Sequence, residues 1–191
     1  MNYETKNFDY LLGLFGLSDQ LLKNHFTLYQ GYVTNVNKIL EERKKLIDSD
    51  QTSSPVFAEL TRRLGWEWNG LRLHELYFEN LTQETKKLDP ASSLFLEIEQ
   101  SFGNFENWEK EFRAIGAMRG IGWVILYRDT VTGKLLNVWI NEHDVGHLSG
   151  AKPIIVLDVF EHAFMLDYGI KRADYLNIFM THLDWPVIEK R

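Results

Sequence analysis

Cysteine is absent from this chain of 191 residues. Its absence excludes a disulfide framework, cysteine-based zinc and iron–sulfur sites, and a thiol nucleophile. Any metal ion must therefore bind through histidine, aspartate or glutamate side chains.

Long apolar runs and an excess of positive charge are lacking as well. No run of about 18 apolar residues is present, which excludes a transmembrane helix. Lysine and arginine number 21 against 27 aspartates and glutamates, for a net charge of −6, so a nucleic-acid partner is not expected. Residues 1–14 lack the basic start and the small-residue cleavage site of a signal peptide, which predicts a cytoplasmic protein.

The first half of the chain has the pattern of two long helices. Ser18 or Asp19 can cap a helix over about 20–47, which contains no proline and repeats apolar residues at helical spacing. A polar stretch follows, and Pro55 stands at the first position of a second helix over about 55–81. Two long helices joined by a short loop predict an antiparallel hairpin.

The second half has a different pattern, and the boundary at Leu88-Asp89-Pro90 predicts two domains, 1–88 and 89–191. The elements expected after it are short helices over 92–101 and 106–116, strands over 123–127, 135–140 and 154–157, and closing helices over about 160–168 and 173–189. The predicted fold class is α+β: a long N-terminal α-hairpin followed by a C-terminal α/β domain with a three-stranded antiparallel sheet.

Two histidines fall within the long helices. His25 and His74 should face each other, because antiparallel helices of similar length bring their middles together. A further signal is Asp158-Val159-Phe160-Glu161-His162, directly after an apolar strand. On a helix that begins at Asp158, the side chains of Asp158 and His162 would share a face. Three imidazoles and one carboxylate suit zinc, iron or manganese, and this site would lie between the two halves of the chain.

A rival metal site consists of His143 and His147, which are four residues apart beside Glu142 and Asp144. These histidines could hold the zinc ion of a hydrolase. The segment follows a strand and contains glycine, so we expect a loop, in which helical spacing does not bring side chains together. No general base is placed beside this pair, which favours the four-residue cluster.

Several motifs together resemble the iron/manganese superoxide dismutase family. They are Asp158-Val159-Phe160-Glu161-His162-Ala163-Phe164, Asp174-Tyr175-Leu176, Tyr32-Val33-Thr34-Asn35, Phe102-Gly103-Asn104-Phe105, Gly122-Trp123 and the two helix histidines. The resemblance extends from about Leu17 to Trp185. It implies the same two-part fold and the disproportionation of superoxide to oxygen and hydrogen peroxide, with one iron or manganese ion per subunit.

The resemblance also implies roles for individual residues. The metal ligands would be His25, His74, Asp158 and His162. Tyr32 would lie at the mouth of the substrate channel, and Trp123 would line the pocket. Glu161 of one subunit would hydrogen-bond His162 of the other, so a homodimer or a tetramer is expected.

The chain departs from the family's pattern beside the metal and in the channel. The usual outer-sphere glutamine is missing: Gly70 stands at one of its two positions, and His143 or the adjacent Glu142 stands at the other. His143 is favoured because imidazole can both donate and accept a hydrogen bond. The channel positions hold Leu28 or Tyr29 in place of a histidine and Met165 in place of a tyrosine.

We therefore expect an antioxidant oxidoreductase in which Tyr32 and His143 act beside the four metal ligands. The alternative is a relative that binds metal but has weak or lost dismutase activity. The departures in the outer sphere and the channel are the features that support this alternative.

Overall fold

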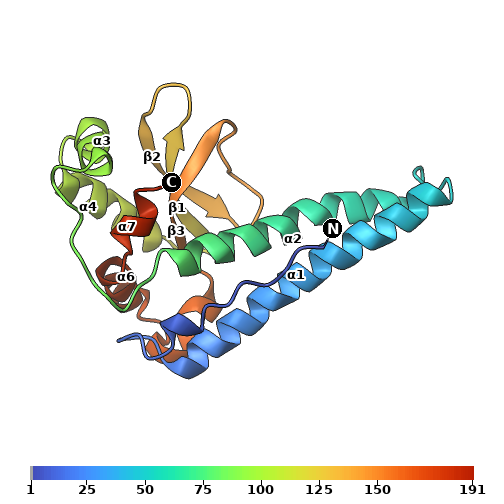
Figure 1. Cartoon of the computed structure of the whole chain (residues 1–191), viewed down its shortest axis with the longest axis horizontal. Coiled ribbons are helices and arrows are strands. Elements are labelled where there is room, and N and C mark those ends of the chain that lie inside the picture. The colour runs from blue at the N-terminus through green and yellow to red at the C-terminus, as the bar shows by residue number, and fades with distance from the viewer. Residues whose placement is uncertain (1) are drawn as a thin grey trace.

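The structure, a computed structural model, describes residues 2–191. Two long helices, α1 (Asp19–Asp48) and α2 (Pro55–Glu79), form the predicted antiparallel hairpin, whose far end projects away from the rest of the molecule (Figure 1). The side chains of Ser18 and Ser54 cap these helices, because each hydroxyl oxygen accepts a hydrogen bond from a backbone N–H of the first turn. Pro55 follows directly at a position where no N–H is needed.

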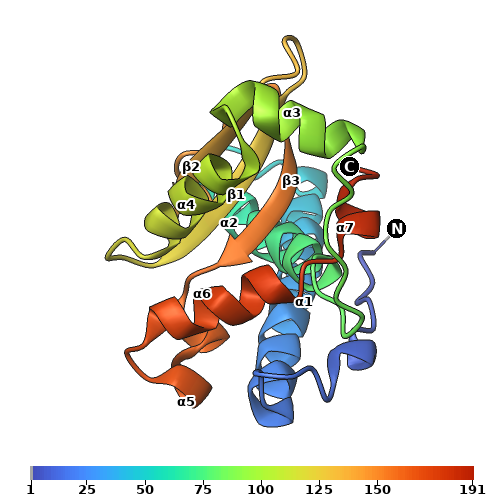
Figure 2. The ribbon, with the colours of Figure 1, turned by 90° about the vertical axis from the view of Figure 1, so that its left-hand side faces the viewer.

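The C-terminal half contains a sheet of three antiparallel strands, β1 (Gly122–Asp129), β2 (Leu135–Asn141) and β3 (Ala151–Asp158), in the order β2-β1-β3. The predicted α+β fold is thus confirmed. Helices α3 (Ser93–Phe102) and α4 (Phe105–Gly116) pack against β2, and α4 also contacts β1 (Figure 2). Gly122 has a φ of 143°, and a Cβ atom there would lie 2.0 Å from the Ile140 carbonyl oxygen, so β1 must begin with glycine.

The closing helices are shorter than predicted. The expected helix over 160–168 is divided into a 3₁₀ turn, η2 (Glu161–Ala163), and a single turn, α5 (Met165–Tyr168). The expected helix over 173–189 is divided into α6 (Arg172–Thr181) and α7 (Trp185–Ile188). Pro186 explains the second break. Proline has no backbone N–H to donate to the carbonyl four residues earlier, and its ring clashes with that carbonyl, so it is tolerated only in the first turn of a helix.

The two halves meet where the sheet faces the hairpin. Helix α2 packs against β3, and α1 packs against η2. The Tyr175 hydroxyl donates to the backbone carbonyl oxygen of Asp158 at 2.8 Å and lies 3.1 Å from the Tyr77 hydroxyl, which joins α6, β3 and α2. The end of β3 is therefore held against α2. The division into domains at 88/89 stays a prediction.

Among the described residues, no helix combines the length and the apolar character that crossing a membrane requires.

Candidate metal centre

Four side chains converge between the hairpin and the sheet. The Nε2 atoms of His25, His74 and His162 lie 3.2, 3.7 and 3.0 Å from Oδ2 of Asp158. One ligand atom from each of the four residues lies within 4.8 Å of the others. Ligand atoms held at about 2.1 Å from an ion are separated by roughly 3 to 4 Å. The spacing therefore suits a single metal ion.

The hairpin contributes two of these residues, though not from the middle of its helices. His25 lies in the second turn of α1 and His74 near the end of α2, and the antiparallel arrangement places these helix ends side by side. The two imidazole rings are buried, with centroids 5.0 Å apart. The prediction that the histidines face each other is correct, but the expectation that they meet at the helix middles was wrong.

The sheet contributes the other two residues. Asp158 is the last residue of β3, and His162 lies in the η2 turn. The prediction that both would share one face of a helix was wrong, because the strand continues through Asp158. The 3₁₀ turn nevertheless returns the His162 ring to the carboxylate, and its Nε2 lies within hydrogen-bond distance of Oδ2.

Hydrogen bonds to groups outside the cluster orient two of the four candidate ligands. Nδ1 of His74 lies 2.5 Å from the Gly70 carbonyl oxygen and must donate to it, so the proton is on Nδ1 and the lone pair is on Nε2. Oδ1 of Asp158 accepts a hydrogen bond from the backbone N–H of Phe160 at 2.8 Å. Its other oxygen, Oδ2, is directed at the three imidazoles. These contacts fix the positions of atoms that could bind a metal ion.

The cluster fits a cation because its buried nitrogens are not satisfied by protein groups. Nε2 of His74 and both ring nitrogens of His25 are buried without a hydrogen-bond partner among residues 2–191, since the 3.2 Å contact of His25 Nε2 with Asp158 does not have the geometry of a hydrogen bond. Leaving such an atom unpaired costs about 1–3 kcal/mol, and folded proteins contain few examples. A metal ion would use these lone pairs. Three imidazoles and one carboxylate are ligands that iron, manganese and zinc accept.

Burial determines which charges the cluster carries. It lowers the pKa of His25 and His74, so both rings are neutral near pH 7. Burial would raise the pKa of Asp158, but the adjacent imidazoles of His162 and His25 hold it well below its usual range. The carboxylate is therefore ionised and brings the only negative charge to the ligand set, which leaves net positive charge on a divalent or trivalent ion.

Tyr32, His143 and Trp123 form a hydrogen-bonded chain beside the cluster. The Trp123 Nε1–H donates to Nδ1 of His143 at 3.0 Å. An indole N–H can only donate, so the neutral His143 ring carries its proton on Nε2, which donates to the Tyr32 hydroxyl oxygen at 2.8 Å. Burial lowers the pKa of His143 to about 4 and raises the pKa of Tyr32. The imidazole is therefore neutral and the phenol protonated near pH 7.

A glycine on α2 makes room for Tyr32. A Cβ atom at Gly70 would lie 2.6 Å from Cδ1 of the Tyr32 ring, well inside contact distance. The Tyr32 ring is packed between His74 and His143, with its centroid 5.0 Å from the centroid of each. A larger residue at position 70 would displace Tyr32, so the group that hydrogen-bonds the tyrosine comes from the loop after β2 instead.

His143 and Glu142 are neighbours in that loop, but their side chains diverge. Glu142 is exposed, and its Oε2 accepts a hydrogen bond from the Trp66 Nε1–H at 3.1 Å. The His143 ring is buried, with its centroid 4.5 Å from Trp66 and 4.8 Å from Phe160. Sequence reasoning missed Trp66, because an aromatic residue in a long helix is by itself a sign of a core position.

The residues at the expected channel positions do not take the place of the histidine and tyrosine that the family pattern has there. Tyr29 is buried, and its hydroxyl donates to Oε1 of Glu75 at 2.9 Å and accepts from the Lys6 N–H at 3.0 Å. Leu28 is partly buried at the edge of the core, and Met165 is 49% exposed. Tyr29 has the one hydroxyl group at these positions, and its hydrogen bonds all lie within the core beside the hairpin.

His143 and His147 do not form the rival zinc site. Both ring nitrogens of His143 are used in the hydrogen bonds with Tyr32 and Trp123, and Nε2 of His147 donates to the His143 backbone carbonyl at 2.8 Å. Over residues 2–191, the four-residue cluster is the one group of three or more His, Asp and Glu side chains with the spacing of metal ligands.

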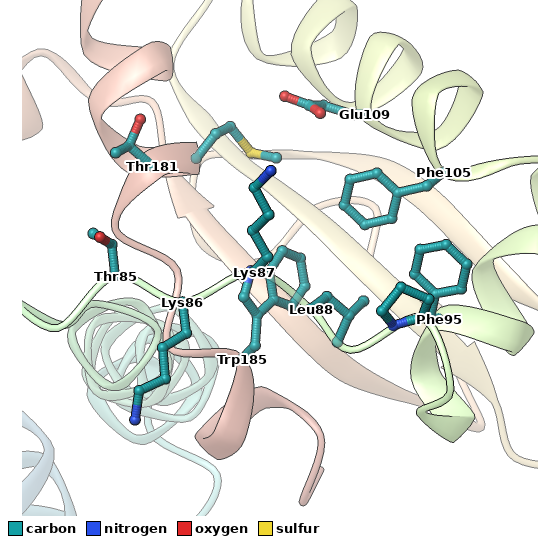
Figure 3. Close-up of a pocket in the computed structure, with 11 residues that line it drawn as sticks. Thr85, Lys86, Lys87, Leu88, Phe95, Phe105, Glu109, Thr181 and Trp185 are labelled. Atoms are coloured by element: carbon teal, nitrogen blue, oxygen red, sulfur yellow. The ribbon is translucent and has the colours of Figure 1, made fainter.

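A separate cavity of about 670 Å³ lies between the linker that follows α2 and helices α3, α4, α6 and α7. Figure 3 shows the aromatic rings of Phe95, Phe105 and Trp185 around it, with the Lys87 side chain extending among them. The cavity shares no lining residue with the cluster or with the Tyr32–His143–Trp123 chain. It is therefore separate from both groups of residues.

Known proteins are similar to this sequence over most of its length. Residues 90–191 match the family model described as "Iron/manganese superoxide dismutases, C-terminal domain". The iron superoxide dismutase of Saccharolobus solfataricus is 32% identical over 179 residues, which cover 92% of this chain and 85% of that protein. The iron enzyme of Cupriavidus metallidurans is 37% identical (90% and 86% covered), and manganese superoxide dismutase 2 of Haloferax volcanii is 34% identical (88% and 83% covered).

Proposed function

This chain belongs to the iron/manganese superoxide dismutase family, and we propose that it converts two superoxide ions and two protons to oxygen and hydrogen peroxide. The observation that carries the proposal is the buried cluster of three imidazoles and one carboxylate, with atoms spaced for one ion. Relatives bear the names of iron and of manganese superoxide dismutases, so we propose one iron or manganese ion per subunit.

A bound iron or manganese ion would supply the one-electron exchange that oxidises one superoxide and reduces the next. His25, His74, Asp158 and His162 would hold that ion. Their single carboxylate charge does not neutralise it, so the site would attract a small anion even though the whole chain is acidic. The residues thus favour an anionic substrate through local charge.

Reduction of superoxide to peroxide consumes two protons, and Tyr32 is positioned to help provide them. Its hydroxyl oxygen accepts the His143 Nε2–H, so the hydroxyl's own hydrogen is free to be directed elsewhere. Burial raises the pKa of Tyr32, which keeps this proton in place until an anion can take it. We therefore propose Tyr32 and His143 as the residues that act beside the metal.

The direct test of this function is metal content together with superoxide consumption. Protein prepared with iron or manganese should hold about one ion per chain and consume superoxide, and removal of the ion by a chelator should abolish the activity. Restoration by the same metal is the control. Protein that contains zinc alone and is inactive would contradict the proposal. Bound iron or manganese without activity would favour the alternative of a metal-binding relative that has weak or lost dismutase activity.

We also propose that a second copy of this chain docks beside His162. The Nε2 of His162 faces the cluster, which leaves Nδ1 for an outside group, and the adjacent Glu161 is exposed. A hollow of about 390 Å³ next to Glu161 is lined by Met118, Met165 and Ile170, which are 46%, 49% and 94% exposed. Apolar side chains gathered on a surface are typical of protein interfaces.

Sedimentation equilibrium should show twice the 22.5 kDa chain mass, or four times if two dimers pair. Substitution Glu161→Ala should weaken the association and lower metal retention, because it removes the acceptor proposed for the partner's ligand histidine. Lys44→Ala, which removes an exposed ion pair at the far end of the hairpin, is the matched control. A monomer of 22.5 kDa at micromolar concentration would contradict the proposal.

An antioxidant role in the cytoplasm completes the proposal. The chain has no cysteine, so its folding needs no oxidising compartment. Fractionation of cells that express the protein, followed by detection with an antibody, is the check on its location.

A further inference from the structure

Hydrogen bonds hold the loop that carries His143 at several points. It joins β2 to β3, and paired backbone hydrogen bonds of 2.8 and 3.3 Å between Asn141 and Val145 close the turn at its start, which contains His143. Glu142 has a φ of 51°, a left-handed conformation that costs a non-glycine residue roughly 1 kcal/mol or more, and Trp66 holds its carboxylate. A strained loop of this kind keeps its shape only if its surroundings fix it.

His147 also holds this loop through hydrogen bonds, and its two ring nitrogens have distinct roles. A carbonyl oxygen can only accept, so the His147 Nε2–H donates to the backbone oxygen of His143 at 2.8 Å. In the tautomer with its proton on Nε2, the ring has a lone pair on Nδ1, which accepts the hydroxyl hydrogen of Tyr127 at 2.6 Å. Tyr127 is 3% exposed, and burial raises its pKa to about 12, so it remains a donor.

Both ends of His143 are thereby attached to one strand. Trp123 and Tyr127 are four residues apart on β1, an even spacing that directs both side chains to the same face. Trp123 bonds the His143 ring, and Tyr127 reaches the His143 backbone through His147. A peptide carbonyl has no exchangeable proton, so the link through His147 transmits position and carries no proton.

We infer that His147 is a positioning residue: by tying the His143 carbonyl to the Tyr127 hydroxyl, it fixes where the His143 imidazole meets Tyr32. The inference rests on the proposed function only in taking His143 as the outer-sphere residue. His147 thus has a use that needs no metal coordination, although its spacing from His143 resembles that of a ligand pair.

The test compares His147→Phe, which keeps a ring but loses both hydrogen bonds, with His147→Gln, whose amide can donate to the carbonyl and accept from Tyr127. We expect His147→Phe to bind metal normally and to lose about three- to tenfold in kcat/KM. His147→Gln should recover most of the loss. Tyr127→Phe, which removes the hydroxyl alone, should resemble His147→Phe.

A second readout needs neither metal nor turnover. The ring ¹⁵N shifts of His143 in the metal-free protein should report a single Nε2–H tautomer in wild type and His147→Gln, and an averaged or broadened signal in His147→Phe. His182→Phe is the matched control, because His182 also bonds a backbone carbonyl, that of Thr82, but belongs to the segment between α6 and α7. It should leave the His143 signal unchanged.

The outcomes separate this inference from the proposed function. If His147→Phe keeps both the wild-type His143 signal and the wild-type kcat/KM, the inference is overturned. Equal loss of thermal stability in His147→Phe and His182→Phe, with the His143 signal unchanged in both, would also overturn it, since that result describes structural damage alone. An inactive wild-type enzyme would count against the proposed function, while the ¹⁵N shifts would still decide the role of His147.

Discussion

Asp158→Asn should fold, lose most of its bound metal and retain less than about one hundredth of the wild-type activity. Even residues that only support metal ligands typically change affinity or activity by about 10–100-fold, so loss of a ligand should exceed that range. Asp158 brings the only negative charge to the cluster, and Asn has nearly the same shape. The expected loss therefore arises from charge and donor strength, with little change in packing.

The fold of the variant is expected to survive because most contacts of Asp158 remain available. The backbone oxygen at this position still accepts the Tyr175 hydroxyl hydrogen, and an amide oxygen can accept the Phe160 N–H as Oδ1 does. Metal content and superoxide consumption are the measurements, with circular dichroism to confirm folding. Asp129→Asn, at the partly exposed end of β1, is a matched control that should behave as wild type. Full metal content and activity in Asp158→Asn would remove Asp158 from the ligand set.

His143→Phe should keep the metal and lose about 10–100-fold in kcat/KM. The phenyl ring fills the space between Trp66 and Phe160 but removes both hydrogen bonds of the imidazole. The Trp123 N–H is then buried without an acceptor, and Tyr32 loses its donor. His143→Gln is the conservative control, because its amide can donate to Tyr32 and accept from Trp123, and it should stay within about fivefold of wild type.

The pH profile gives an independent reading of the same residue. Burial lowers the pKa of His143 to about 4, so the ring does not change charge between about pH 5.5 and 7.5. Wild-type activity should be level over that interval and should decline only as the pH approaches the lowered value, where protonation of Nδ1 would break the bond from Trp123. An inflection near pH 6.5 that disappears in His143→Gln would show that His143 is not held as the structure has it.

The helices and strands that could be predicted from the sequence have strong local signals. Ser18, Ser54 and Pro55 mark the starts of the hairpin helices, and apolar runs bounded by turn residues mark the strands. The features that could not be predicted depend on tertiary contacts. Asp158 and His162 meet across a strand end and a 3₁₀ turn, which spacing alone cannot distinguish from a helix that begins at Asp158.

The surroundings of Tyr32 were only partly predictable for the same reason. Imidazole chemistry favoured His143 over Glu142, but nothing local shows that Gly70 must be small until the Tyr32 ring is seen against it. The spacing of His147 suggested a metal ligand, whereas its hydrogen bonds to the His143 carbonyl and to Tyr127 give it another role. Residues that act through neighbours leave weak patterns, because their partners come from other elements.

The central claim is that one redox-active ion lies between the hairpin and the sheet. Anomalous X-ray diffraction from crystals of the active protein, collected at the iron and manganese absorption edges, tests it most directly. We predict one anomalous peak per chain, surrounded by His25, His74, Asp158 and His162. A peak at His143 and His147, or active crystals with no iron or manganese peak inside the four-residue cluster, would contradict the account.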